Sequence, residues 1–343
     1  MSFQEKNGWN NNEMAEQPKM ATIEKVTTSR NGFELSCELH NLPVSFVNAL
    51  RRLLLSSIPT VVITDVEIIE NTTQLPHEML KHRFEMLPIN ILPENIVKFR
   101  DTTIELHVPA DKAQKETRVI TTEQFKTNSE HSKIIMKDRD LDTPLIFLRI
   151  RPGEGVHIRG KLAVSTYGTS QVCTVGTGWH VDKESELYKV NRTKWVEDKK
   201  DVREFDNSAY QRYYSRDEKT GLPNWFDVHI ESIGIMKSKD ILKEALRLLR
   251  KNVEEYVKEA LENIQHENKV FKIKLDRGGH TIGNLMQSII YENKNVEFVS
   301  YDVLHPLRPA MEIQFYSEKS GESILKNAKE VIEEYCEKVE SGL

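Results

Sequence analysis

The sequence predicts an α+β protein made of two similar units, the first of which is interrupted by an inserted β-rich domain. Two strand–helix–strand patterns, at about 23–68 and 269–303, support this prediction, because alternation of apolar and polar residues gives way to helical spacing in both. Each pattern is followed further along the chain by a long amphipathic helix. In the first copy about 150 residues intervene, so an insertion divides that unit.

The first predicted elements are a strand, a helix and a second strand. Within a strand-like stretch from Ile23 to Leu39, residues 32–39 alternate as a half-buried strand requires. Pro43 fits the first turn of the following helix, and Pro59 ends it. The β-branched run 61–68 predicts the next strand. The apolar face of the helix consists of Phe46, Leu50, Leu53 and Leu54.

The middle of the chain, from about 70 to 222, has a less regular pattern with short strands at 146–150 and 161–165. Residues 181–220 contain ten acidic and ten basic side chains interleaved with aromatic residues. Stacking of nucleic-acid bases on these aromatics is one interpretation, but the charges cancel and supply no attraction for phosphates. We therefore expect a solvated insertion or long loop in this region.

The remainder of the chain predicts a strand at 226–230, a helix at 238–265 and a compact α+β unit of about 75 residues. The long helix has an apolar face that exceeds what one small sheet would cover, so part of it should meet another helix. The final unit consists of strands at 269–275, 296–303 and 311–316, a helix at 281–292 and a final helix at 324–339.

An internal similarity relates the two strand–helix–strand patterns. Asn48 precedes Asp65 by 17 residues, and Asn284 precedes Asp302 by 18, with apolar helical positions between them in both copies. Two such units would be expected to pack with approximate two-fold symmetry, so the chain resembles a dimer made covalent. Chance similarity between two amphipathic segments is the alternative.

Composition excludes several classes of protein. The 343 residues suffice for two domains of ordinary size, and 38% hydrophobic with 29% charged residues is typical of a soluble globular protein. The formal charge of −5 disfavours dominant direct binding of nucleic acid. Three widely separated cysteines offer no C-x-x-C pair for a zinc site. We expect residues 1–20 to form a flexible tail, and no segment has the apolar length of a membrane span.

The motifs that could indicate catalysis or metal binding do not meet the requirements of those sites. His77 and His82 flank a glutamate but are five residues apart, which places them on diverging faces of a helix. The glycines at 153–155 and 176–178 lack the ending of a phosphate-binding loop and are interpreted as turn glycines. We therefore predict no catalytic residues and no metal ligands.

Arg51 and Arg52 are the side chains most suited to a contact with another protein. Both project from a helix whose other face is apolar, and the arginine fork suits bidentate capture of carboxylates or carbonyls. Solvated surface arginines are the alternative. Asn48 and Asn284 occupy matching positions and are expected to bond to local backbone.

The run from Asn48 to Pro59, NALRRLLLSSIP, resembles the signature of bacterial RNA polymerase alpha subunits and their counterparts, the D-type polypeptide of archaeal polymerases and the third-largest polypeptide of eukaryotic ones. Residues 71–73, 82–83 and 87–89 are similar to the archaeal and eukaryotic version, as is the return at 226–234. Independently, 280–285 and 301–306 resemble the small partner, the archaeal L-type polypeptide and its eukaryotic homologues. The resemblance covers about 21–340, weakly between 100 and 220.

This resemblance implies two alpha-type RNA polymerase dimerisation domains that form an intramolecular pseudo-dimer. The implied domains are 21–64 with 223–267, an insertion at 65–222, and 268–343. Their role would be a non-catalytic assembly scaffold that binds the largest and second-largest catalytic subunits and small assembly subunits, and meets DNA and RNA only through the complex. The expected subunit-interface residues are Asn48, Arg51, Arg52, His82, Arg83, Leu248, Tyr256, His280, Asn284, Val331 and Tyr335.

The resemblance also suggests a source and a missing cofactor. The two partners are ordinarily separate chains, and fused forms are similar to those of large nucleocytoplasmic DNA viruses. That origin would place the protein in the host cytoplasm, at viral factories, and in the virion; a cellular origin would place it in the nucleus or cytoplasm. The inserted domain lacks the clustered cysteines that bind zinc in many eukaryotic relatives, so we expect no cofactor there.

Two other functions are compatible with the pattern. An adaptor protein could use the same fold outside a polymerase and would not associate with large polymerase subunits. A small-molecule enzyme with its site in the inserted domain would show a deep pocket with convergent ionisable groups.

Overall fold

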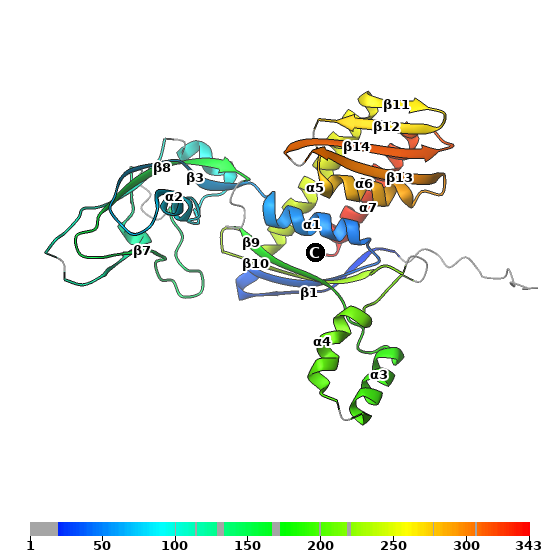
Figure 1. The fold of residues 1–343 in the computed structure, drawn as a ribbon, viewed down its shortest axis with the longest axis horizontal. Coiled ribbons are helices and arrows are strands. Elements are labelled where there is room, and N and C mark those ends of the chain that lie inside the picture. The colour runs from blue at the N-terminus through cyan, green and yellow to red at the C-terminus, as the bar shows by residue number, and fades with distance from the viewer. Residues whose placement is uncertain are drawn as a thin grey trace, which may run out of the picture.

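The computed structural model describes residues 20–99, 101–113, 115–128, 134–166, 172–198, 200–217, 221–276, 278–305 and 307–343. Two four-stranded sheets enclose a layer of helices, and a separate domain lies to one side (Figure 1). Most of the expected tail, residues 1–19, lies outside the described ranges. Of the helices in the described part of the chain, none combines the length and apolar character needed to span a bilayer.

The first unit is an antiparallel sheet with strand order β1-β2-β10-β9, covered on one face by two helices. The alternation predicted at 32–39 places Leu35, Cys37 and Leu39 in the core and the residues between them on the outer face. The elements are β1 (Thr22–Ser29), η1 (Arg30–Gly32), β2 (Glu34–His40), α1 (Val44–Ser56), β9 (Cys173–Trp179), β10 (Trp225–Ser232) and α5 (Ser238–Asn263).

The second unit repeats this arrangement with strand order β11-β12-β14-β13. Its sheet directs Ile273, Ile313 and Phe315 toward the helical layer. The elements are β11 (Ile264–Glu267), β12 (Val270–Leu275), α6 (His280–Tyr291), β13 (Val296–His305), β14 (Arg308–Ser317) and α7 (Gly321–Ser341).

The two units share one hydrophobic core formed by α1, α5, α6 and α7 between the sheets (Figure 1). Phe46 of α1 meets Tyr335 of α7 edge to face, with ring centroids 5.5 Å apart. Ion pairs join the helices at the surface, with Arg250 2.6 Å from Glu340. The predicted α+β class and the pairing of two similar units in one chain are therefore confirmed.

The inserted domain has its own core and a sheet of order β3-β8-β4-β6. Phe84 of the helix α2 packs against Phe147 at its centre. The elements are β3 (Thr60–Asn71), α2 (His77–Glu85), η2 (Pro93–Phe99), β4 (Thr103–Val108), β5 (Arg118–Thr121), η3 (Thr122–Gln124), β6 (Lys126–Thr127), β7 (Ile146–Ile150) and β8 (Val156–Ser165).

The charged region 181–220 is a helical hairpin, not the long loop expected from its charge balance. It contains α3 (Glu186–Glu197) and α4 (Val202–Arg212) and projects from the first sheet (Figure 1). Tyr188, Phe205 and Tyr213 form a small core in which the aromatic rings contact one another. These aromatic residues therefore serve packing within the hairpin.

Several boundaries differ from those predicted. Residues 60–64, assigned to the first unit, begin β3, which pairs with β8 of the inserted domain. The return into the first unit comes earlier than 223, because β9 pairs with β10, and this pairing puts Gly176 and Gly178 in a strand and not in a turn. Residues 264–267 form β11 of the second sheet. The match between Asp65 and Asp302 is therefore not structural, since β9 and not β3 takes the place that β13 holds in the second unit.

Candidate subunit interface

Helix α1 carries the arginine pair on the face that turns away from the core. Its apolar residues Phe46, Leu50 and Leu54 are buried, which leaves the polar side chains between them at the surface. Asn48 lies inside the helix and its Oδ1 accepts hydrogen bonds from Nη2 of Arg51 at 2.8 Å and from Nε at 3.3 Å. Asn48 thus holds an arginine side chain, not the local backbone as expected.

Arg52 lies at a groove between the two units, in a cavity of about 390 Å³. Its guanidinium has no hydrogen bond or ion pair with any residue of the described ranges. The wall opposite α1 is the beginning of α6, including His280, and α5 contributes Tyr256. The groove is lined by Arg52, Leu53, Ser56, Ser57, Asn252, Glu255, Tyr256, Gly278, Gly279, His280, Thr281 and Ile282. Three of the predicted interface residues therefore meet at one place.

The electrostatics of this groove favour a partner that accepts hydrogen bonds. The first N–H groups of a helix have no intrahelical acceptor, and no described side chain caps α6 at Gly279. The Tyr256 hydroxyl is buried beneath the groove and finds no partner among the described residues, and burial raises the pKa of Tyr256. Glu255 is the acidic member of the lining and lies 3.8 Å from Lys251. A carboxylate or a carbonyl oxygen from another chain fits the exposed guanidinium of Arg52.

Three other predicted residues lie at the junction between the two units. Leu248, Val331 and Tyr335 are partly buried and pack against the shared core. Burial raises the pKa of Tyr335 to about 12, assisted by Glu292 and Glu334. These side chains hold the two units together inside the chain.

The remaining predicted residues lie apart from the groove. Arg83 on α2 of the inserted domain donates from Nε and Nη2 to the carbonyl of Phe147, at 2.9 and 2.5 Å, so it fixes packing within that domain. His82 is exposed on the same helix. Asn284 is exposed on α6. The structure does not bring these three together with Arg52.

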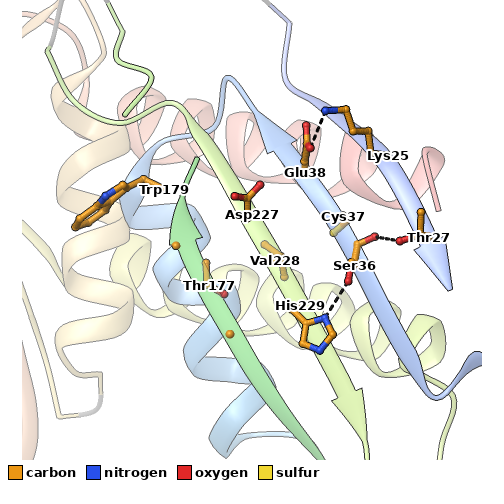
Figure 2. A pocket seen from close by; sticks show the side chains of 12 residues that line it. Lys25, Thr27, Ser36, Cys37, Glu38, Thr177, Trp179, Asp227, Val228 and His229 are labelled. Atoms are coloured by element: carbon orange, nitrogen blue, oxygen red, sulfur yellow. Dashed lines mark hydrogen bonds and ion pairs between the residues drawn. The ribbon is translucent and has the colours of Figure 1, made fainter. Parts of the chain in front are cut away.

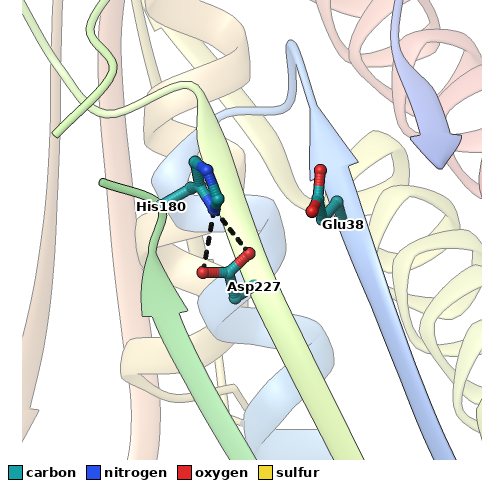
Figure 3. A group of neighbouring side chains, drawn as sticks. All are labelled: Glu38, His180 and Asp227. Carbon is teal, nitrogen blue, oxygen red and sulfur yellow. Dashed lines mark hydrogen bonds and ion pairs between the residues drawn. The ribbon is translucent and has the colours of Figure 1, made fainter. Parts of the chain in front are cut away.

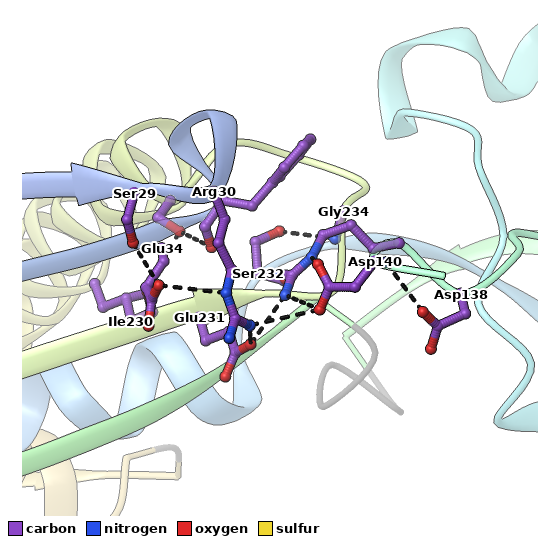
Figure 4. Close-up of polar contacts among 12 residues, drawn as sticks. Ser29, Arg30, Glu34, Asp138, Asp140, Ile230, Glu231, Ser232 and Gly234 are labelled. Atoms are coloured by element: carbon purple, nitrogen blue, oxygen red, sulfur yellow. Dashed lines mark hydrogen bonds and ion pairs between the residues drawn. The ribbon is translucent and has the colours of Figure 1, made fainter. Parts of the chain in front are cut away.

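Sequence patterns did not reveal the network that joins the inserted domain to the first sheet. Arg139 donates from Nη2 to Glu231 at 3.0 Å and from Nε to Asp140 at 3.0 Å, and its Nη1 donates to the carbonyl of Ser232 (Figure 4). Arg30 lies 2.9 Å from Glu231 on the same side. Nothing in the sequence marks these residues, because they come from three distant segments.

The outer face of the first sheet holds a second feature that patterns did not predict. An open cavity of about 800 Å³ extends over β1, β2, β10 and β9 (Figure 2). At its edge His180 and Asp227 face each other, and Glu38 lies on the neighbouring strand (Figure 3). Within the described ranges this is the one group of three side chains close enough to hold a metal ion together. Alternation in β2 and β10 gives the face on which two of these residues lie, but only the strand pairing places them side by side.

Comparison with known protein families identifies the family of this chain. Residues 36–253, more than half of the chain, match the family described as the RNA polymerase Rpb3/Rpb11 dimerisation domain. The chain belongs to this family. A second profile with the same description matches residues 270–342, which is the second unit of the fold. Both dimerisation domains of the pseudo-dimer are thus present in one polypeptide.

Individual relatives support the same family. The chain is 27% identical over 270 residues to the DNA-directed RNA polymerases I and III subunit rpac1 of Dictyostelium discoideum, which covers 64% of this chain and 76% of that protein. It is 37% identical over 83 residues to the DNA-directed RNA polymerase subunit Rpo3 of Methanocaldococcus jannaschii, 23% of this chain and 43% of the relative. A conjugation stage-specific protein of Tetrahymena thermophila is 38% identical over 71 residues, 21% of this chain and 23% of its own length. The chain thus spans less than half of the last two relatives.

Proposed function

We propose that this chain is a non-catalytic assembly subunit of a multisubunit DNA-dependent RNA polymerase and takes part in transcription. The observation that carries the proposal is the shared core of two Rpb3/Rpb11 dimerisation domains, which makes a rigid platform without a second chain. Polymerase subunits among the relatives support it. Nucleotide addition would take place in the partner subunits.

The partners that we propose are the largest and second-largest catalytic subunits, together with small assembly subunits. The groove beside Arg52 supports one contact, since it joins an exposed guanidinium to the start of α6 at the surface of the platform. A carboxylate-bearing segment of a large subunit is its proposed occupant. DNA and RNA would be met through the complex, which is consistent with the formal charge of −5.

We also propose that the chain represents the fusion of two subunits that are separate elsewhere. Two family matches in one chain, packed around one core, support this origin. The similarity to fused subunits of large nucleocytoplasmic DNA viruses supports a viral source, with the protein in the host cytoplasm and the virion. Immunolocalisation in infected cells and in purified particles tests this; a nuclear signal without infection would indicate a cellular protein.

The docking proposal is tested by charge reversal at the groove. Arg52→Glu in the tagged full chain is expected to reduce recovery of the large polymerase subunits at least about tenfold, because a like charge would face the partner carboxylate. Arg192→Glu on the projecting hairpin is a matched control that should leave recovery unchanged, since Arg192 lies on α3, away from α1. Equal recovery with both variants would remove Arg52 from the interface.

The same experiment separates the alternative functions. An adaptor outside a polymerase would recover no large polymerase subunit from any variant. An enzyme site in the inserted domain receives no support from the cavity of about 800 Å³, which lies on the first sheet and not in that domain.

A further inference from the structure

The outer face of the first sheet carries a row of carboxylates that is short of positive charge. Glu24 pairs with Glu38 across β1 and β2, and Glu38 pairs with Asp227 across β2 and β10, so three acidic residues lie directly opposite one another. Like charges in such cross-strand positions destabilise a sheet. Lys25, 2.9 Å from Glu38, is the permanent cation that the described residues bring to this row. When the neighbouring histidines are neutral, three carboxylates and one ammonium leave the row with two negative charges. One divalent cation would balance them.

Histidine completes the row. Nδ1 of His180 lies 2.8 and 3.0 Å from the two carboxylate oxygens of Asp227 (Figure 3). One ligand atom from each of Glu38, His180 and Asp227 lies within 4.8 Å of the other two. Tetrahedral zinc with bonds of about 2.0–2.2 Å places its ligand atoms about 3.4 Å apart, so rotation of the carboxylates brings the three into range.

Trp225 positions two of the three ligands, His180 and Glu38, before any ion arrives. The backbone N–H of His180 donates to the carbonyl of Trp225 at 2.8 Å, and the Trp225 ring stacks on the imidazole with centroids 4.0 Å apart. The Trp225 indole also donates to Glu38 at 3.2 Å. His40 lies beside Glu38, and its Nε2 is buried, 3.4 Å from a Glu38 oxygen, without a hydrogen bond among the described residues. The contacts of Trp225 are of the outer-shell kind that orients metal ligands.

We propose that Glu38, His180 and Asp227 form a binding site for a divalent transition metal ion of the zinc class. One imidazole nitrogen with two carboxylate oxygens suits Zn²⁺ better than Mg²⁺, which prefers oxygen ligands alone. Three protein ligands leave a fourth position for water or a group from another molecule. Lys25 has a flexible side chain that is 66% exposed, so it can move away, and the ion then neutralises the Glu38 carboxylate in its place.

The site would fasten the base of the helical hairpin. His180 directly follows β9 and Asp227 lies in β10, so the hairpin of α3 and α4 leaves and returns between these two ligands. Glu38 comes from β2, the next strand of the sheet. An ion bound by all three residues therefore ties both ends of the hairpin to the centre of the first sheet.

The test uses the untagged full chain, stripped with a chelator and titrated with Zn²⁺ against a chromophoric competitor. One Zn²⁺ per chain is expected, and His180→Ala and Asp227→Asn, which each remove a ligand, should weaken binding by more than the roughly tenfold that loss of an outer-shell partner costs. His229→Ala is the matched control, because His229 lies 3.4 Å from Glu34 on the same sheet face without a third ligand. Lys25→Ala should strengthen binding by removing the competing ammonium. Equal affinity in wild type and His180→Ala, or no stoichiometric binding, would overturn the proposal.

Two further measurements guard against misfolded variants and adventitious binding. Asp227→Asn removes the repulsion with Glu38 but also the ion pair with His180, so without metal its Tm should stay close to that of wild type. Zn²⁺ should raise the Tm of wild type and of His229→Ala, and raise that of Asp227→Asn much less. Zn²⁺ should also slow amide exchange at residues 180–182 and 223–227 in wild type and in His229→Ala. Zinc binding without this local protection would indicate an adventitious ion and contradict the proposed site.

Discussion

The two dimerisation units have the same strand order, yet only the second keeps its chain continuous. In the second unit α6 leads directly into β13, the edge strand of the sheet, whereas in the first unit α1 leads into β3 and out to the inserted domain. The vacant sheet position is filled by β9 when the chain returns. A sheet position can therefore be filled by a different segment without loss of the helical platform.

The corresponding helices α6 and α1 differ at the position where α6 approaches β13. Gly283 of α6 lies so close to β13 that a Cβ atom there would come within 2.5 Å of the Tyr301 ring. Asn48 and Asn284 correspond, so the matching residue in α1 is Val47, which is buried in the shared core. Gly283 thus allows an approach of α6 to β13 that a side chain would prevent, whereas α1 carries a buried valine at the matching position.

The largest effect is expected from a substitution that disrupts the shared core. Phe46→Ala removes a fully buried ring that contacts Tyr335 of the other unit, and such truncations cost about 3–5 kcal/mol of unfolding free energy. Hydrogen exchange should then rise in both units. Phe84→Ala, an equally buried ring of the inserted domain, is the control and should raise exchange in that domain alone. Confinement of the Phe46→Ala effect to the first unit would show that the units do not share a core.

The second prediction concerns the close helix contact. Gly283→Val overpacks α6 against Tyr301 and Met311 and should cost about 1–3 kcal/mol, measured by denaturant unfolding. Val47→Gly in α1 tests the matching position, where loss of a buried side chain and the lower helix propensity of glycine both destabilise. A neutral Gly283→Val would contradict the difference in packing between the two units.

The third prediction loosens the inserted domain from the first unit. Arg139→Ala leaves the buried Ser232 carbonyl and Glu231 without this donor and should cost about 1–2 kcal/mol. Limited proteolysis at the junction should become faster, while cleavage within the second unit is unchanged. Arg159→Ala removes a surface ion pair with Glu67 inside the inserted domain and serves as the control.

The smallest expected effect is a dependence of the same junction on pH. The hydrogen bond from Arg139 holds the pKa of Asp140 below its usual value, so its contribution is present above the unfolded-state pKa and is lost as pH falls through the folded-state pKa. The Tm difference between wild type and Asp140→Asn should therefore be small at neutral pH and vanish in acid. A difference that grows on acidification would contradict this sign.

The sequence predicted those parts of the molecule that depend on local periodicity. The expected helices at 238–265 and 281–292 correspond to α5 and α6 within two residues at each end, because their apolar faces repeat at helical spacing. Charge balance at 181–220 did not reveal α3 and α4, whose small aromatic core is formed by residues at irregular spacing. Strand pairing could not be predicted from the sequence, so the start of β3 was assigned to the first unit, whereas β3 pairs with β8 of the inserted domain.

The candidate interface was predicted only in part, because local sequence patterns do not show which segments the fold brings together. Arg52 was named from its place on an amphipathic helix, with support from the family resemblance, and His280 from the resemblance alone; the fold brings them to one groove. Glu38, His180 and Asp227 were not found, since they lie far apart in the chain and meet only through the register of β2 with β10.

Purification of the tagged chain from its native source, with identification of its partners by mass spectrometry, tests the central claim most directly. The paired units in one chain predict recovery of two very large polymerase subunits and DNA-templated RNA synthesis, without a separate small dimerisation partner, because α6 and α7 already cover the face that such a partner would occupy. Recovery of a lone 39.8 kDa species, or of a second dimerisation subunit bound to α1 and α5, would contradict the claim that the two units of this chain form the platform without a second chain.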